Sequence, residues 1–146
     1  MTVMLVLFLL LHHALPAFGV ANIFFLHTSS EKTLGPFQRC AVESAARFNP
    51  EATVTVFSNS LKREPLLSLG LGPNVRLERF SYDAEFSAVS PELAAWFHAG
   101  SWAAGGYCHV NLADALRLAL LYSRGGTYFD TDMVSVKVCV CAYRVH

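Results

Sequence analysis

The chain has 146 residues, of which 53% are hydrophobic and 15% are charged. This length and composition suit one folded domain with its own core and exclude an intrinsically disordered chain. Eleven basic residues balance eleven acidic residues, so the formal net charge is zero and there is no basic field to attract nucleic acid.

The N-terminal segment is strongly apolar. The first charged residue is Glu31, and residues 3–11 form a continuous hydrophobic run. Nine helical residues span about 14 Å, which is short of the roughly 30 Å hydrocarbon core of a bilayer. Residues 1–20 are therefore predicted to be a signal peptide, with Ala17–Gly19 as a small-x-small cleavage site. If the apolar run is counted through to Val20, the segment is predicted to be a signal anchor instead. The remaining alternative is that this N-terminal segment packs in the core of the domain.

Strands and helices are predicted to alternate along the rest of the chain. Runs rich in apolar, aromatic or β-branched residues predict strands over 21–27, 53–57, 75–80 and 127–129. Helical spacing and end signals predict helices over 37–48, 91–97 and 112–123, the last with Asn111 as its N-cap. Segments 61–74 and 98–107 are predicted to be loops. This order indicates an α/β domain with a mostly parallel sheet flanked by helices.

The four cysteines are Cys40, Cys108, Cys139 and Cys141. Entry into the secretory pathway would permit disulfides. Cys139 and Cys141 are too close in sequence for an easy internal bridge, so a bridge between Cys40 and Cys108 is expected. Buried free thiols are the alternative.

The stretch most typical of a functional site is Gly125–Asp132 (GGTYFDTD). Alternate side chains of an extended strand point to the same face, so Asp130 and Asp132 are expected to converge at a strand end. Two close carboxylates resist ionising together, and a hard divalent cation with oxygen ligands resolves that conflict. The pair therefore predicts a metal site that keeps positions open for water or for a substrate phosphate.

The helix that leads into this stretch carries a charged pair. Asp114 and Arg117 lie three residues apart and share one face of a helix that is otherwise very apolar. A surface ion pair worth under about 1 kcal/mol is one interpretation. The apolar surroundings favour the other, in which the pair lines a cleft.

The sequence DALRLALLYSRGGTYFDTD over residues 114–132 closely resembles the sugar-binding DXD region of the α1,4-glycosyltransferase family. Residues 22–29 and 40–51 are similar to the first strand and helix of that family. The resemblance covers residues 21–137, which would form the DXD-containing donor-binding domain, and leaves 138–146 as a divergent tail.

The resemblance implies a GT-A-like (Rossmann-like) nucleotide-sugar-binding half domain. It implies transfer of galactose, N-acetylgalactosamine or N-acetylglucosamine from a UDP-sugar to a glycolipid or glycan acceptor, in α1,4 linkage with retention of anomeric configuration. It also implies dependence on Mn²⁺ or another divalent cation. The expected location is the Golgi membrane in type II orientation, with a secreted or luminal form as the alternative if the signal is cleaved.

The resemblance also implies roles for individual residues. Asp130 and Asp132 would hold the metal and the donor diphosphate. Asp114 and Arg117 would contact the donor sugar, and Tyr128 would help to shape the donor pocket. No catalytic residue is assigned.

At the other end of the resemblance, the loop with Thr28 and Ser29 would approach the uridine. The sequence departs from the family at His27, where members carry an acidic residue, and a strand-end histidine without a role is the simplest interpretation. The family also continues well beyond the fourteen residues that follow Asp132 here. The chain is therefore predicted to be the truncated, donor-binding part of such an enzyme.

Two other hypotheses stay open at this point. The first is an inactive remnant that binds UDP-sugar weakly or pairs with a full-length relative. The second is a phosphatase of the haloacid-dehalogenase type, with Asp130 as the nucleophile. That class places its acidic motif on an early strand, whereas here the motif comes last.

Overall fold

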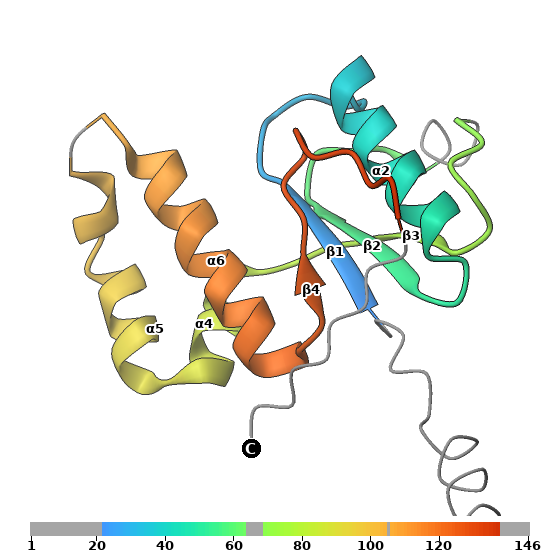
Figure 1. The fold of residues 1–146 in the computed structure, drawn as a ribbon. Helices are drawn as coiled ribbons and strands as arrows, with labels where there is room; N and C mark the ends of the chain where they lie inside the picture. The colour runs from blue at the N-terminus through green and yellow to red at the C-terminus, as the bar shows by residue number, and fades with distance from the viewer. Residues whose placement is uncertain (1–21, 64–68, 105, 138–146) are drawn as a thin grey trace, which may run out of the picture.

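A computed structural model describes residues 22–63, 69–104 and 106–137 (Figure 1). The predicted signal segment, 1–20, and the divergent tail, 138–146, lie outside the described residues, as do Cys139 and Cys141. Within the described ranges, no helix combines the length and the apolar character needed to cross a membrane.

The described chain is built on one four-stranded sheet in the order β3–β2–β1–β4. The strands are β1 (Asn22–His27), β2 (Thr53–Ser58), β3 (Val75–Glu78) and β4 (Thr127–Tyr128). Every neighbouring pair is parallel, with Phe24 of β1 opposite Thr55 and Tyr128. The predicted parallel sheet is confirmed, although β3 and β4 end earlier than predicted.

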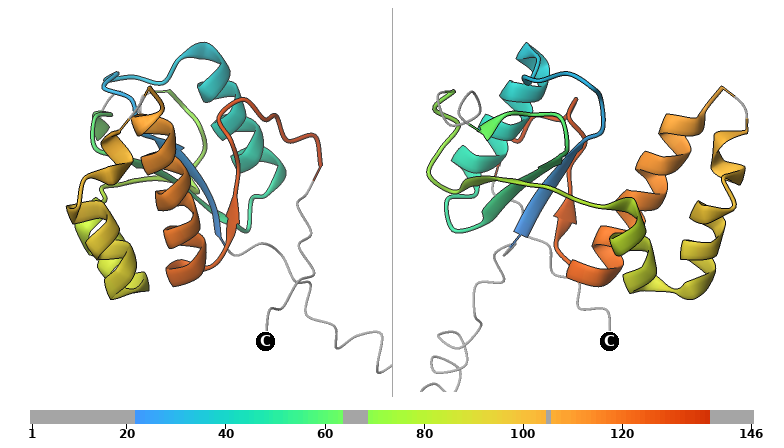
Figure 2. Two further views of the ribbon diagram at one scale, coloured as in Figure 1. Left: turned by 90° about the vertical axis from the view of Figure 1, so that its left-hand side faces the viewer. Right: turned by 180° about the vertical axis from the view of Figure 1, so that it is seen from behind.

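Helices cover both faces of this sheet. They are α2 (Pro36–Phe48), α4 (Tyr82–Val89), α5 (Pro91–His98) and α6 (Cys108–Arg124), with a short 3₁₀ helix η1 (Ser101–Ala103). Helix α2 lies on one side of the sheet, and α4, α5 and α6 lie on the other (Figures 1 and 2). The predicted α/β architecture with flanking helices is therefore confirmed.

The two faces have separate cores because strand side chains alternate between them. Ile23 and Phe25 point to the α2 side and are fully buried there with alanines and Val42 of the helix. Phe24 and Leu26 point to the other side and pack with Leu116 and Phe86 of α6 and α4. A strand that is buried on both faces has a continuous apolar run, as Ile23–Leu26 does.

One prediction about helix positions was wrong, and one helix was not predicted. Helix α6 begins at Cys108, so Asn111 lies one turn inside it, where its backbone N–H donates to the carbonyl of Tyr107 at 2.9 Å. Asn111 is therefore not the N-cap. The helix α4 was not predicted at all, although Ser81 accepts a hydrogen bond from the Ala84 N–H at 3.4 Å, as a polar N-cap does.

The predicted disulfide between Cys40 and Cys108 was also wrong. Both thiols are free in the structure. Cys40 is exposed on α2, whereas the half-buried Cys108 begins α6, and the sheet separates these helices. The alternative prediction was buried free thiols. It is correct that Cys40 and Cys108 are free, but neither of them is buried.

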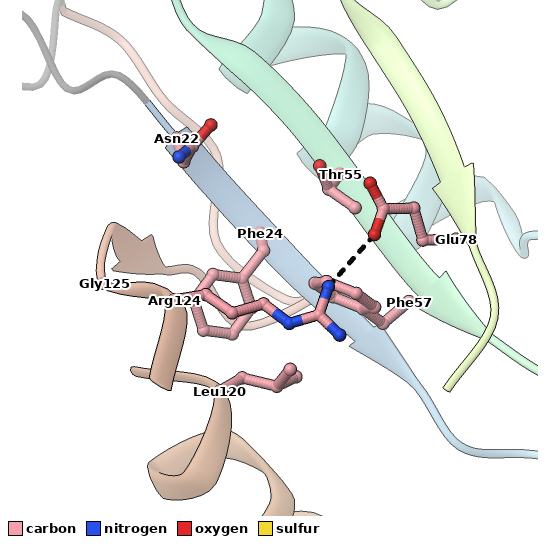
Figure 3. Close-up of a pocket in the computed structure, with 8 residues that line it drawn as sticks. All are labelled: Asn22, Phe24, Thr55, Phe57, Glu78, Leu120, Arg124 and Gly125. Carbon is pink, nitrogen blue, oxygen red and sulfur yellow. Dashed lines mark hydrogen bonds and ion pairs between the residues drawn. The ribbon is translucent and has the colours of Figure 1, made fainter. Parts of the chain in front are cut away.

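Arg124 fixes the C-terminal end of α6 to the sheet. Its guanidinium lies 5.0 Å from the ring centroid of Phe57, and it forms ion pairs with Glu78 at 3.2 Å and with the buried Glu85. Figure 3 shows the Arg124 side chain extending across Phe57 toward Glu78, at the edge of a cavity of about 190 Å³. These contacts join the C-terminal end of α6 to β2, β3 and α4.

Candidate functional site

The order of the strands reverses at β1. The chain proceeds from β1 to β2 and β3 on one side, whereas β4 pairs with the opposite edge of β1. In open parallel sheets, such a reversal creates a crevice beyond the carboxyl ends of the two strands that flank it. A cavity of about 260 Å³ lies at that position and is called the β1–β4 cavity here. Its walls come from the ends of β1 and β4, from α2 and from α6, through Leu26, His27, Thr28, Ser29, Gln38, Ala113, Asp114, Arg117, Tyr128, Asp130 and Thr131.

The fold brings most of the predicted site residues to this one cavity. Six of them line it: Thr28, Ser29, Asp114, Arg117, Tyr128 and Asp130. They come from segments that are about a hundred residues apart in sequence, and the parallel pairing of β1 with β4 joins them. Asp132 does not line the cavity and is exposed.

The charged pair of α6 forms one wall. A nitrogen of the Arg117 guanidinium donates to a carboxylate oxygen of Asp114 at 2.7 Å. The centre of the same guanidinium lies 5.0 Å from the ring centroid of Tyr128. The interpretation that this pair lines a cleft is confirmed, because both side chains border the cavity.

Tyr128 lies between a cation and an anion. Burial raises the pKa of the Tyr128 hydroxyl above its usual value of 10, and the charge of Asp130 acts in the same direction. Arg117 opposes both effects. The phenol therefore stays protonated at neutral pH and can donate a hydrogen bond within the cavity.

The acidic pair does not have the conformation predicted for it. Strand β4 ends at Tyr128, and the backbone then turns, with the N–H of Met133 donating to the carbonyl of Asp130 at 3.2 Å. An Asp130 carboxylate oxygen also accepts the N–H of Thr131 at 2.8 Å. The alternation of an extended strand therefore does not apply to Asp130 and Asp132. They share an exposed turn instead of one face of a strand.

The chemistry of this turn suits a weakly enclosed cation. Within the described ranges, no group of three or more His, Cys, Asp or Glu side chains is placed to hold a metal ion. Asp130 and Asp132 are both exposed, and no ion pair with Lys, Arg or His is formed by either of them in the same ranges. Two carboxylates that bind a hard divalent ion leave most of its coordination positions to water or phosphate oxygens. Asp130 and Asp132 therefore offer the ligand type that a hard divalent ion prefers, and the metal site at this turn stays a prediction.

Five lining residues were not among the predicted site residues: Leu26, His27, Gln38, Ala113 and Thr131. His27 and Gln38 have the largest polar side chains of the five. His27 ends β1, and its side chain is 2% exposed. Gln38 lies in the first turn of α2, where its side-chain oxygen accepts the Gly35 N–H at 3.0 Å. Both positions follow from the topology, because the end of β1 and the start of the next helix must flank a crevice at the carboxyl edge.

Similarity to characterised proteins agrees with this geometry. Residues 36–140 match the family model described as "Glycosyltransferase sugar-binding region containing DXD motif". The chain is 36% identical to rat lactosylceramide 4-alpha-galactosyltransferase, over 80% of this chain and 34% of the relative. The corresponding human enzyme is 37% identical over 80% of this chain and 35% of its own length.

A second human relative, alpha-1,4-N-acetylglucosaminyltransferase, is 32% identical over 80% of this chain and 36% of its own length. Among solved structures, the PaToxG glycosyltransferase superposes with a TM-score of 0.57 at 18% identity, over 82% of this chain and 44% of that chain. This superposition indicates a GT-A-like fold. The chain thus spans about a third of the length of the curated relatives. The extent of the family match shows that the chain belongs to the family of glycosyltransferases whose sugar-binding region contains a DXD motif.

Proposed function

We propose that the chain is the donor-binding part of a glycosyltransferase that transfers galactose, N-acetylgalactosamine or N-acetylglucosamine from a UDP-sugar to a glycolipid or glycan acceptor. The transfer would form an α1,4 linkage with retention of configuration. The observation that carries this proposal is the gathering of Thr28, Ser29, Arg117, Tyr128 and Asp130 around one cavity at the switch point of the sheet.

The residues on the β1 side would bind the nucleotide. Thr28 and Ser29 are exposed at the carboxyl end of β1, where the loop that they begin would contact a uracil or ribose. This edge is the usual place for a nucleotide in an open parallel sheet.

The residues on the α6 side would bind the sugar. The Arg117–Asp114 pair supplies both hydrogen-bond donors and acceptors, which suits the adjacent hydroxyls of a hexose. Tyr128 places its ring beneath the Arg117 guanidinium and so limits the conformations that the guanidinium can adopt. The α6 wall would thereby orient the donor sugar relative to its diphosphate.

The carboxylates of Asp130 and Asp132 would hold a divalent cation, with Mn²⁺ as the expected ion. Such a cation, when bound, neutralises charge that builds on the departing diphosphate. Because Asp130 lines the cavity and Asp132 lies outside it, Asp130 would make the main contact with this ion. A Golgi location in type II orientation, through the N-terminal apolar segment, belongs to the same proposal.

A second candidate is a form that binds UDP-sugar but does not transfer the sugar, or that acts only in a pair with a longer relative. The observation behind this second candidate is that the chain spans about a third of the length of the curated relatives. In that case the β1–β4 cavity would still bind the nucleotide, but the acceptor side would come from another chain.

Donor hydrolysis and transfer separate these two functions. UDP-galactose, UDP-N-acetylgalactosamine and UDP-N-acetylglucosamine would each be incubated with the protein and Mn²⁺, with and without lactosylceramide, and released UDP would be measured. Release that is stimulated by acceptor supports the enzyme. Mn²⁺-dependent UDP binding without release from any donor supports the binding form, and absence of UDP binding contradicts both.

A further inference from the structure

A cluster of one imidazole and three hydroxyls extends from the wall of the β1–β4 cavity toward the end of β2; its His27 and Ser58 are buried, Ser60 is half-buried and Ser29 is exposed. The Nδ1 atom of His27 lies 3.1 Å from the hydroxyl of Ser58 and 3.3 Å from that of Ser60. The Nε2 atom lies 3.1 Å from the hydroxyl of Ser29. His27 therefore connects the loop after β1, which lines the cavity, to the loop after β2, which does not.

The hydroxyls of Ser58, the last residue of β2, and of Ser60, in the loop that follows, also bind backbone groups. Ser58 Oγ accepts the N–H groups of Ser60 and Leu61, each at 3.2 Å. Ser60 Oγ donates to the carbonyl of Ser29 at 2.7 Å. The hydroxyl hydrogen of Ser60 is therefore used in the bond to the Ser29 carbonyl. Most of the capacity of Ser58 Oγ to accept hydrogen bonds is used by the two backbone N–H groups. These bonds fix the position of Ser29 from behind.

A neutral His27 suits these partners. Burial lowers the pKa of His27 below its usual value, while a backbone hydrogen bond and the charge of Glu31 act in the opposite direction. A neutral imidazole has one donor and one acceptor nitrogen, so it can accept from one hydroxyl and donate to another. A protonated ring would have two donors and no acceptor, so Nδ1 could no longer accept from Ser58, whose Oγ already accepts two backbone N–H groups and has no lone pair left for an Nδ1–H.

The charged groups around His27 come from several elements. Glu31 follows in the same loop, and the side chains of Asp114, Arg117 and Asp130 line the cavity that His27 also lines. Behind the cluster, the guanidinium of Arg79 donates to the carbonyls of Ser58 and Leu61, at 2.7 and 2.6 Å. No carboxylate of the described residues forms an ion pair with His27. A proton on the ring would therefore gain no direct counter-ion.

We propose that His27, Ser58 and Ser60 are positioning residues that hold the Thr28–Ser29 wall in the form that binds the nucleotide, and that protonation of His27 releases this wall. The proposal rests on the proposed function, because it concerns the same cavity. Release of the exposed loop gives the charged imidazole access to water, which is the least costly way to solvate it. Nucleotide affinity would then fall as the pH falls.

The first test is UDP affinity between pH 5.0 and 8.0, in saturating Mn²⁺, for the wild type and for His27→Gln. The glutamine amide reaches toward Ser29 as Nε2 does, but it does not titrate. The diphosphate itself titrates near pH 6, so the ratio of the two dissociation constants at each pH is the quantity to compare. We expect this ratio to change by about tenfold between pH 7.5 and 5.0. A ratio that does not change with pH overturns the role of protonation.

The second test separates positioning from ligand contact. Ser60 does not line the cavity, yet Ser60→Ala removes the bond to the Ser29 carbonyl and should weaken UDP binding about fivefold. The matched control, Ser87→Ala, lies on the exposed surface of α4 and should leave affinity unchanged. Equal affinities of Ser60→Ala and the wild type would refute the positioning role.

A third measurement needs no ligand. In a two-dimensional NMR titration of the free protein, the backbone amide signals of residues 28–31 should shift with the same midpoint as the His27 ring, and those of α2 residues 41–46 should not. If the loop does not follow the ring, the coupling is wrong even if UDP binds. If the loop follows the ring but the wild type does not bind UDP at any pH, the proposed function fails and the nucleotide role of the cluster fails with it.

Discussion

The guanidinium of Arg117 lies 5.0 Å from the ring centroid of Tyr128 and 2.7 Å from a carboxylate oxygen of Asp114. Helix α6 and strand β4 are thereby joined at the wall of the β1–β4 cavity. Because the Arg117 side chain is about one-third exposed, at 33%, it is held on two sides and still accessible to a ligand. In the proposed function, Arg117 is the residue through which α6 would contact the donor sugar.

Replacement of Arg117 should distinguish the sugar from the nucleotide. Arg117→Lys keeps the charge but loses the planar, forked contact with Asp114 and the stacking on Tyr128. We expect it to weaken binding of UDP-galactose by about tenfold while UDP affinity changes by less than about twofold. Isothermal titration with both ligands measures the difference. Equal losses for UDP and UDP-galactose would assign Arg117 to the nucleotide instead.

The two glycines before β4 should differ in their tolerance of alanine. Gly125 and Gly126 both have positive φ, +65° and +93°. A Cβ on Gly125 would meet open space, whereas one on Gly126 would lie 2.8 Å from the carbonyl oxygen of Asn22. Gly125 has φ 65° and ψ −160°, a conformation adopted almost only by glycine, so Gly125→Ala should cost about 2 kcal/mol of unfolding free energy, and Gly126→Ala, which adds a clash, about 3 kcal/mol or more.

Urea denaturation of the two glycine variants provides the measurement, with Gly125→Ala as the matched control for backbone strain. A clash with the Asn22 backbone would also displace β4 from β1, so Gly126→Ala should lose UDP affinity as well. Similar stabilities of the two variants would show that β4 does not need this close approach to β1.

Stability should fall at acidic pH through His27. The pKa of His27 is lowered in the folded state, so between that value and about 6.5 the unfolded chain binds the extra proton. The free energy of unfolding contributed by this group is therefore constant above pH 6.5 and decreases as the pH falls below it. Urea denaturation from pH 5 to 8 should show a smaller pH dependence for His27→Gln than for the wild type, and equal slopes would contradict a buried neutral His27.

The ion pairs of Arg124 should stabilise the attachment of α6. Glu85 is buried, so Arg124→Met would leave its carboxylate without this partner and lower the free energy of unfolding by about 2 kcal/mol. The double variant Arg124→Met with Glu85→Gln should recover part of that loss. Thermal denaturation checks both, and a double variant no more stable than Arg124→Met would mean that packing on Phe57, rather than charge, explains the effect.

The sequence predicted the parts of this fold that have strong local patterns. The apolar runs of β1 and β2 and the helical spacing of α2 are clear because both faces of the sheet are buried, and the structure confirms them. Helix α4 was missed because its eight residues are mostly polar or small, and tertiary packing of Phe86 with Trp96 and Phe97 stabilises it. No short pattern in the sequence indicates such a contact.

The candidate site was predictable in composition but not in geometry. Asp114 and Arg117 were expected to line a cleft because a charged pair interrupts an apolar helix, and they do so. The acidic pair was assumed to continue the strand, but β4 ends at Tyr128 and a turn separates Asp132 from the cavity. The cluster around His27 was not predictable, because Ser58 and Ser60 meet it only through the parallel pairing of β1 with β2.

The most direct test of the donor site is UDP binding by isothermal titration, with and without Mn²⁺, for the wild type, Asp130→Asn and Asp83→Asn. Asp83 is an exposed carboxylate of α4 that pairs with His98 at 2.8 Å, so its variant controls for the loss of one charge. A donor site that holds its cation through Asp130 predicts Mn²⁺-dependent binding that falls at least about tenfold in Asp130→Asn and is unchanged in Asp83→Asn. Mn²⁺-dependent UDP binding of wild-type strength in Asp130→Asn would contradict it.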